Sequence, residues 1–128
     1  MGTIIAARVF ATLIVGAILF QIGLIVGMPW GEFAWGGYYP GTLPTNMRLA
    51  SVASAFILLA IGLIVLIRAG LILPSWQPVS TKLVWVVVAY CGLGVIANAI
   101  TLSFWERVIW LPVLIICFTS SLVVAKGQ

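Results

Sequence analysis

The sequence carries very little charge and no histidine. Of its 128 residues, six are basic and two are acidic, so only 6% of the chain is charged. Soluble domains carry roughly 25% charged residues. Hydrolytic catalysis usually needs a nucleophile activated by a neighbouring base, most often histidine, and that base is missing here. We therefore expect a protein that is not an enzyme.

Cysteine is also scarce, and the two cysteines are far apart. Cys91 and Cys117 both fall inside apolar stretches, and the chain has no C-x-x-C motif. Metal sites and disulfide-exchange sites need clustered Cys, His or acidic residues, so we expect no metal, no cofactor and two thiols that only pack. The six basic residues are scattered rather than clustered, which argues against a nucleic-acid partner.

Long apolar runs dominate what remains. Hydrophobic residues make up 64% of the chain and the mean hydropathy is +1.31. Uncharged stretches cover residues 9–28, 49–67, 83–102 and 108–125, each near the roughly 20 residues that cross about 30 Å of hydrocarbon as a helix. The first stretch exceeds the 7–15 residues of a signal-peptide core, so we expect it to stay as a mature helix.

These runs predict an all-α fold, an integral membrane four-helix bundle. We expect one transmembrane domain over residues 1–128, with helices at about 3–28, 47–68, 82–102 and 104–125. Basic residues favour the cytoplasmic ends of spans. An orientation with both termini inside puts four basic residues at inner ends and two at outer ends. The inner residues are Arg8, Arg68, Lys82 and Lys126, and the outer ones are Arg48 and Arg107. The predicted location is the inner (plasma) membrane, with several passes.

The connection between the first two spans, "PWGEFAWGGYYPGTLPTNMR" at residues 29–48, is rich in tryptophan and glycine. Its rings are typical of an aromatic belt at the membrane surface. Its glycines favour specific backbone turns, which instead indicates a structured outer loop folded over the bundle as a lid. Arg48 lies at a helix start, where the helix dipole disfavours a cation. We therefore expect an ion pair between Arg48 and Glu32.

Two further patterns predict structural roles. "SFWE" at residues 103–106 is typical of a capping box, with Ser103 as the N-cap and the Glu106 side chain reaching back to the Ser103 amide. Gly16, Gly23 and Gly27 form one stripe on the first helix. Small residues of this kind allow close helix packing in lipid, so we expect another helix to pack on the stripe.

Polar residues in the outer half of the spans indicate where a ligand would bind. Gln21 and Asn98 lie one to two turns below the outer helix ends. Each amide is explained either by a hydrogen bond between helices or by a polar cavity under the lid. The candidate ligand-binding residues are Gln21, Trp30, Glu32, Trp35, Arg48, Asn98, Thr101 and Trp105.

Three stretches together, "PWGEFAWGG", "LPTNMRLAS" and "NAITLSFWERVIWLP", resemble a family of small, functionally uncharacterised bacterial membrane proteins. Its motifs are PWG-x-x-AWGG and LPT-x-x-R, and the resemblance covers most of the chain. It implies a bacterial inner-membrane location and four transmembrane helices. It brings no activity, substrate or catalytic residue.

The sequence therefore predicts a non-catalytic membrane protein, either a lipid-binding or small-amphiphile-binding protein or an accessory subunit. Its cavity would be polar and aromatic and would face outward. The alternative is a small oligomeric transporter or channel. Coupled transporters commonly place an acid inside the membrane, whereas the two acids of this chain fall outside the apolar stretches. The expected partners are membrane lipids and a second copy of the chain or another membrane protein.

Overall fold

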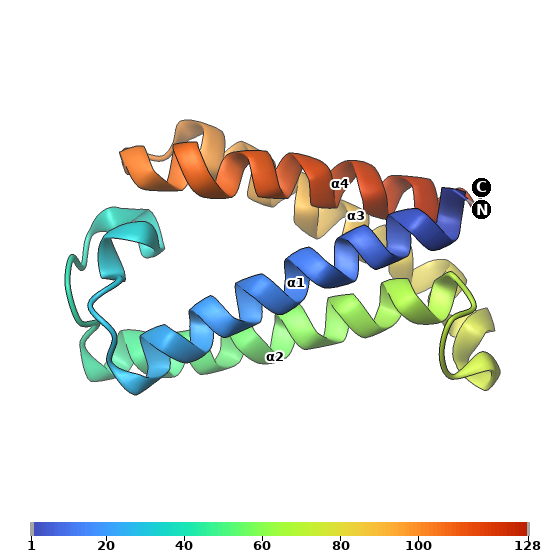
Figure 1. The fold of residues 1–128 in the computed structure, drawn as a ribbon, viewed down its shortest axis with the longest axis horizontal. Coiled ribbons are helices and arrows are strands. Elements are labelled where there is room, and N and C mark those ends of the chain that lie inside the picture. The colour runs from blue at the N-terminus through green and yellow to red at the C-terminus, as the bar shows by residue number, and fades with distance from the viewer. Residues whose placement is uncertain (1, 128) are drawn as a thin grey trace.

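The computed structural model describes residues 2–127, which form a bundle of four long helices (Figure 1). The helices are α1 (Gly2–Val26), α2 (Thr45–Arg68), α3 (Gln77–Ile100) and α4 (Leu111–Ala125), with short turns η1 (Gly31–Phe33), η2 (Trp35–Gly37), η3 (Pro74–Trp76) and η4 (Glu106–Trp110). No strand occurs within residues 2–127, so the predicted all-α class is confirmed. Four helical segments are long and apolar enough to cross a membrane. The chain is a multi-pass membrane protein.

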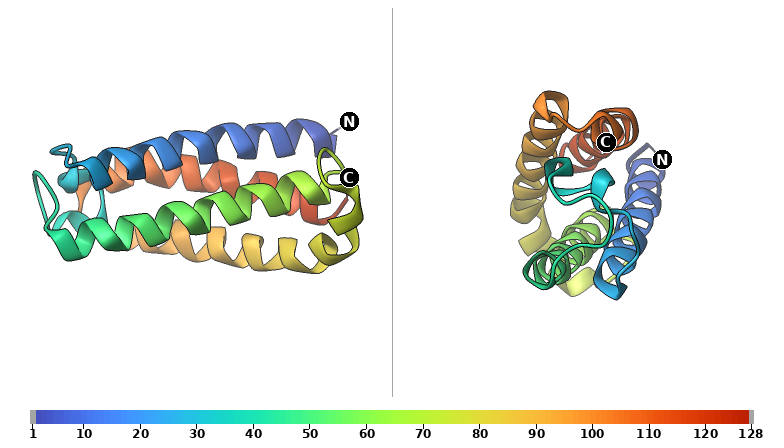
Figure 2. Two further views of the ribbon diagram at one scale, coloured as in Figure 1. Left: turned by 90° about the horizontal axis from the view of Figure 1, so that it is seen from below. Right: turned by 90° about the vertical axis from the view of Figure 1, so that its left-hand side faces the viewer.

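Each helix packs against its neighbours in the chain, and α1 also packs against α4, which closes the ring (Figure 2). Because the helices alternate in direction, α1 begins at the same end of the bundle at which α4 finishes (Figure 1). The connection between α1 and α2 lies at the opposite end. We call these the terminal end and the loop end.

The larger of two hydrophobic clusters in residues 2–127 joins all four helices. It runs from the terminal end, with Phe10, Val65, Val84 and Val124, to the middle of the bundle, with Cys91 and Cys117. Toward the loop end α1 separates from α4 (Figure 1). A second, smaller cluster there contains Leu24 from α1 and two residues of the loop, Ala34 and Leu43. The loop therefore fills space that the diverging helices leave between them.

Helix α3 begins at Gln77, earlier than the expected start near residue 82. Pro74 and Pro78 lie in the first turns of η3 and α3. The missing amide of a proline costs nothing there, because the first amides of a helix have no partner within the helix. The Ser80 hydroxyl donates to the Gln77 carbonyl at 2.7 Å, within the first turn of α3.

The fourth membrane helix opens with a π-helical turn, η4. The Leu111 amide donates to the Glu106 carbonyl, five residues back. Pro112 follows directly. A proline inside an α-helix lacks the amide that would bond four residues back, and its ring would press on that carbonyl, here the one of Val108. The wider π turn relieves this conflict.

Candidate functional site

Residues 29–44 connect α1 to α2 and contain the two short turns η1 and η2, and we call this segment the lid. Hydrogen bonds join the lid to side chains of α2, of η4 and of the residues just before η4. The Ser103 hydroxyl donates to the Glu32 carbonyl at 3.1 Å, and the Trp110 indole donates to the Phe33 carbonyl at 2.9 Å. The Trp35 indole donates to the Ser51 hydroxyl at 3.2 Å. These bonds join the lid to the helices where it lies across the loop end (Figure 2).

Two parts of the lid depend on glycine. Gly31 is buried, and a side-chain carbon there would collide with the carbonyl oxygen of Tyr39. Gly36 and Gly37 have φ angles of +72° and +76°, a region that glycine enters freely. Trp35 has a φ of +52°, which is unusual for a bulky residue. This run of left-handed residues directs the Gly36 amide toward Glu106, the first residue of η4.

The Glu106 side chain accepts a hydrogen bond from that amide. Its carboxylate accepts hydrogen bonds from the Gly36 amide at 2.9 Å and from the Thr101 hydroxyl at 2.7 Å, and the residue is only 9% exposed. The Ser103 hydroxyl does accept from the Glu106 amide, at 3.3 Å. The reciprocal half of the expected capping box does not form, because the Ser103 amide donates to Thr101 instead. Glu106 is thereby free to hold the lid.

The expected ion pair between Glu32 and Arg48 does not form. Arg48 Nε donates to the carbonyl of Ile25 at 2.9 Å, and the Glu32 side chain is exposed. Ile25 lies in the last turn of α1, where carbonyls have no partner in the helix and the dipole favours a cation. The end of α1 therefore offsets the unfavourable position of Arg48 at the start of α2.

The glycine stripe of α1 does not form a single interface between helices in residues 2–127. Gly23 lies against the indole of Trp30, which occupies the space a side chain would need. Gly27 ends α1 with a φ of +101°, and a side-chain carbon added at Gly16 would meet no other group within 4 Å. The expected helix partner is replaced at Gly23 by the lid's own tryptophan.

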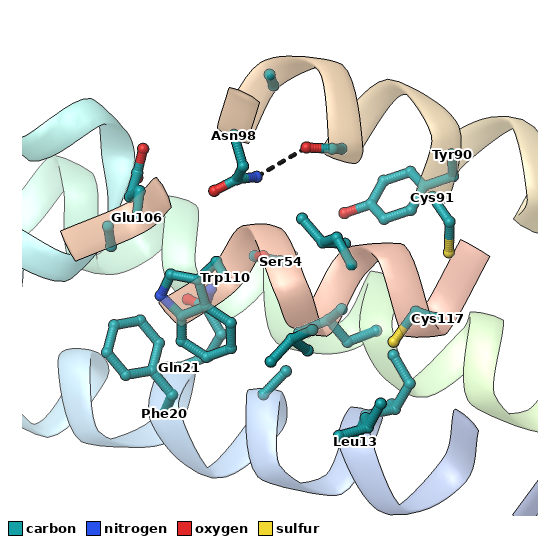
Figure 3. A pocket seen from close by; sticks show the side chains of 18 of the residues that line it. Leu13, Phe20, Gln21, Ser54, Tyr90, Cys91, Asn98, Glu106, Trp110 and Cys117 are labelled. Carbon is teal, nitrogen blue, oxygen red and sulfur yellow. Dashed lines mark hydrogen bonds between the residues drawn. The ribbon is translucent and has the colours of Figure 1, made fainter. Parts of the chain in front are cut away.

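A cavity of about 430 Å³ lies between the four helices beneath the lid, and we call it the central cavity. Most of its walls are apolar. Its polar lining residues are Gln21, Ser54, Tyr90, Asn98 and Glu106. Figure 3 shows the Tyr90 hydroxyl and the Asn98 carbonyl oxygen directed toward the end of the cavity where Glu106 lies.

A second cavity of about 620 Å³, the lateral pocket, lies between the lid and the last turns of α3. It shares Tyr90, Ala97, Asn98 and Glu106 with the central cavity, so the two spaces adjoin at these residues. Its remaining lining residues are Trp35, Gly36, Tyr38, Ile100, Thr101 and Leu102. Tyr90 and Ile100 are exposed on the outer surface of the bundle. Tyr38 and Leu102 are exposed as well, so the lateral pocket opens to the surface of the bundle near the loop end.

A third, aromatic pocket of about 400 Å³ lies between α1 and the π turn, lined by Leu19, Phe20, Trp30, Phe33, Ile109 and Trp110. The Phe20 ring stacks on Trp30 with centroids 6.0 Å apart and meets Trp110 edge-on at 4.9 Å. Phe20, Phe33 and Trp110 also line the central cavity. This aromatic cluster separates the central cavity from the aromatic pocket.

The residues singled out from the sequence are divided among these spaces. Gln21 and Asn98 line the central cavity, Trp35, Asn98 and Thr101 line the lateral pocket, and Trp30 lines the aromatic pocket. Glu32, Arg48 and Trp105 line none of these three. Trp105 packs instead against the rings of Phe33 and Phe104.

The two amides differ in how they are satisfied. Asn98 Nδ2 donates to the Gly94 carbonyl of its own helix at 2.8 Å rather than to a neighbouring helix. The side-chain oxygen of Gln21 is buried without a hydrogen-bond partner among residues 2–127. Both amides thus keep an oxygen free of bonds to other helices, and both residues line the central cavity.

Sequence reasoning missed Tyr90 and Ser54 as lining residues and treated Glu106 only as a cap. Helical spacing offered a signal for Tyr90, because Tyr90, Ala97 and Asn98 lie toward one face of α3 and Thr101 follows at its end. No comparable pattern indicated Ser54. The capping-box motif predicted that the Glu106 carboxylate binds the Ser103 amide, which left no reason to expect it in a cavity wall.

Comparison with known proteins finds no matching family model, curated protein or solved structure. The resemblance of the PWG-x-x-AWGG and LPT-x-x-R motifs to a bacterial family stays a prediction. Any function has to be inferred from the residues themselves.

Proposed function

We propose that this protein is a non-catalytic membrane protein that binds a lipid or a small amphiphile in the central cavity. The ligand enters from the bilayer through the lateral pocket, beneath the lid. The observation that carries this proposal is the junction of the two spaces at Tyr90, Ala97, Asn98 and Glu106. A ligand lying across this junction meets polar groups at one end and apolar walls at the other.

The size and lining of the central cavity support this proposal. Its volume of about 430 Å³ falls within the roughly 300–1,000 Å³ of small-molecule sites, which are mostly apolar with a few placed polar groups. The apolar walls come from all four helices and include Leu13, Leu58, Leu93 and Leu114. An acyl or alkyl chain is the chemistry that such walls accommodate.

A binding role also fits the way in which reactive groups are used. The Ser103 hydroxyl both donates to the lid and accepts from the start of the π turn, so it is occupied as a structural group. Cys91 and Cys117 are almost fully buried in the core. Neither pattern resembles a nucleophile beside an activating base.

We also propose that the protein lies in the inner membrane of a bacterium, with both termini cytoplasmic. Arg8, Arg68, Lys82 and Lys126 lie toward the terminal end of the bundle, which favours that end as the cytoplasmic one. The lid and the lateral pocket then lie in the outer half of the membrane. The ligand would therefore come from the outer leaflet.

The proposal is tested by what the protein carries when it is extracted in a mild detergent. Native mass spectrometry should detect one bound amphiphile on the wild-type protein. Ala97→Trp places an indole where the two cavities adjoin and should remove the bound species. Ala99→Trp is the matched control, because residue 99 lies about 200° around the same helix and lines none of the cavities described. A bound amphiphile that survives Ala97→Trp, or none on the wild-type protein, would contradict the proposal.

A further inference from the structure

The geometry points to the chemical class of the ligand's head group. We propose that it is an amine or a quaternary ammonium, held against the Glu106 carboxylate where the central cavity and the lateral pocket adjoin. This inference rests on the proposed function, since it concerns the same site.

The first observation is a buried carboxylate without a cation. Glu106 is 9% exposed, and no basic side chain forms an ion pair with it within residues 2–127. Arg107, its neighbour in sequence, donates to the Thr101 carbonyl instead. Buried charged groups in proteins are normally paired with an opposite charge. A cationic ligand would supply the partner that the chain does not.

The carboxylate also has room for that partner. It accepts one hydrogen bond on each oxygen, from Gly36 and from Thr101, whereas a carboxylate offers about four acceptor positions. Glu106 lines both the central cavity and the lateral pocket. The unused acceptor positions are therefore available without breaking the bonds that hold the lid.

The second observation is the aromatic lining around the carboxylate. Trp35, Tyr38 and Tyr90 line the lateral pocket together with Glu106. Aromatic ring faces attract cations, and ring clusters of this kind are a known means of recognising quaternary ammonium groups. Trp35 is fixed by its indole bond to Ser51. The pocket thus combines three aromatic rings with the Glu106 carboxylate.

The other polar groups of the central cavity do not select a charge. Gln21 keeps a buried side-chain oxygen without a partner among residues 2–127, and the Asn98 amide nitrogen is used by its own helix. Ser54 and Tyr90 supply hydroxyl groups that can either donate or accept. The choice of head group therefore falls to Glu106: an anionic head group would face its carboxylate, whereas an amine supplies donors and positive charge. The apolar walls of the central cavity then take the alkyl tail.

The test compares two probes that share one tail. Wild-type protein in lipid nanodiscs is titrated with decyltrimethylammonium and with decyl maltoside, and binding to empty nanodiscs is subtracted. We expect the cationic probe to bind at least about tenfold more tightly, because its trimethylammonium group meets the Glu106 charge and the aromatic rings; tenfold corresponds to about 1.4 kcal/mol, within the range of a desolvated cation–π contact. Glu106→Gln should remove this preference, because the amide keeps an acceptor for the lid but loses the charge. Glu32→Gln, which changes the other acid of the chain, should keep it.

The outcomes separate this inference from the proposed function. Equal binding of both probes to the wild-type protein, or a preference that survives Glu106→Gln, overturns the ammonium site while leaving amphiphile binding in place. If neither probe binds, the proposed function fails as well. If Glu106→Gln does not fold, Tyr90→Leu and Tyr90→Phe provide the test. Loss of the preference for the cationic probe in Tyr90→Leu, with retention in Tyr90→Phe, supports the site. The same preference in both variants overturns it.

Discussion

The carboxylate of Glu106 accepts a 2.9 Å hydrogen bond from the amide of Gly36, which lies 70 residues earlier in the chain. This bond joins the lid to the first turn of the fourth membrane helix. Because that turn is π-helical, its geometry is set in part by Pro112. The position of the lid over the cavities therefore depends on a local irregularity in the fourth membrane helix.

The first prediction concerns the hydrogen bond between the Glu106 carboxylate and the Gly36 amide. Glu106→Ala leaves the Gly36 amide and the Thr101 hydroxyl without their acceptor, so we expect a loss of about 1–3 kcal/mol in unfolding free energy. We also expect faster hydrogen exchange at Gly36 and Gly37, because the lid is released. Thermal unfolding in detergent and exchange mass spectrometry would measure the two effects. Glu32→Ala changes an exposed side chain and should stay within about 0.5 kcal/mol of wild type. Equal losses of unfolding free energy in Glu106→Ala and Glu32→Ala would mean that Glu106 does not hold the lid.

The second prediction concerns Arg48. Arg48→Met keeps much of the length of the side chain but removes the donor that binds the Ile25 carbonyl. We expect a loss of about 1.5–3 kcal/mol, the range for hydrogen bonds to charged groups. The charge exchange Glu32→Arg with Arg48→Glu should not restore stability, because the partner of Arg48 is a carbonyl at the end of α1. Recovery in the double variant, measured by thermal unfolding, would instead indicate an ion pair.

The third prediction concerns orientation in the membrane. We expect residues 69–81 inside and the lid outside. Ser75→Cys and Tyr39→Cys place thiols at exposed positions on opposite ends of the bundle, and the native cysteines are buried. An impermeant thiol reagent on intact cells should label Tyr39→Cys and leave Ser75→Cys unlabelled. The reverse labelling pattern would invert the topology.

The membrane helices could be predicted from the sequence because hydropathy and length depend on each segment alone. Uncharged runs near 20 residues indicate spans without any knowledge of packing. The clustered glycines of residues 29–44 likewise favour fixed turns, and the structured character of that loop stays a prediction. These features are local, and local features can be read from a sequence.

The partners of the charged residues could not be predicted in the same way. Glu106 binds the amide of Gly36 and Arg48 binds the carbonyl of Ile25. Backbone groups occur at every residue, so the sequence does not indicate which of them will form a hydrogen bond with a charged side chain. Gln21 and Asn98 did point to a polar cavity under the lid. The shape and remaining walls of the cavities could not be predicted, because they follow from the divergence of α1 and α4 and from how far the lid fills the resulting gap.

The last prediction concerns Gly16 and Gly23 of α1. The sequence places both on one stripe, but in the structure only Gly23 has another side chain packed against it. Gly23 lies against the Trp30 ring, which is itself stacked on Phe20 and has little freedom to move away. Gly23→Ala should therefore cost about 1–3 kcal/mol, as overpacked sites do. Gly16 is exposed and has open space around it. Gly16→Ala should leave stability unchanged or raise it by up to about 1 kcal/mol, since alanine favours helix more than glycine does.

Thermal unfolding and elution volume in detergent would compare the two variants directly. The structure requires a clear difference between them, because only one of the two added methyl groups meets another side chain. If Gly16→Ala destabilised the protein as much as Gly23→Ala, or shifted its elution volume, the glycine stripe would have to pack against a second chain. In that case Trp30 would no longer explain why glycine is needed at position 23.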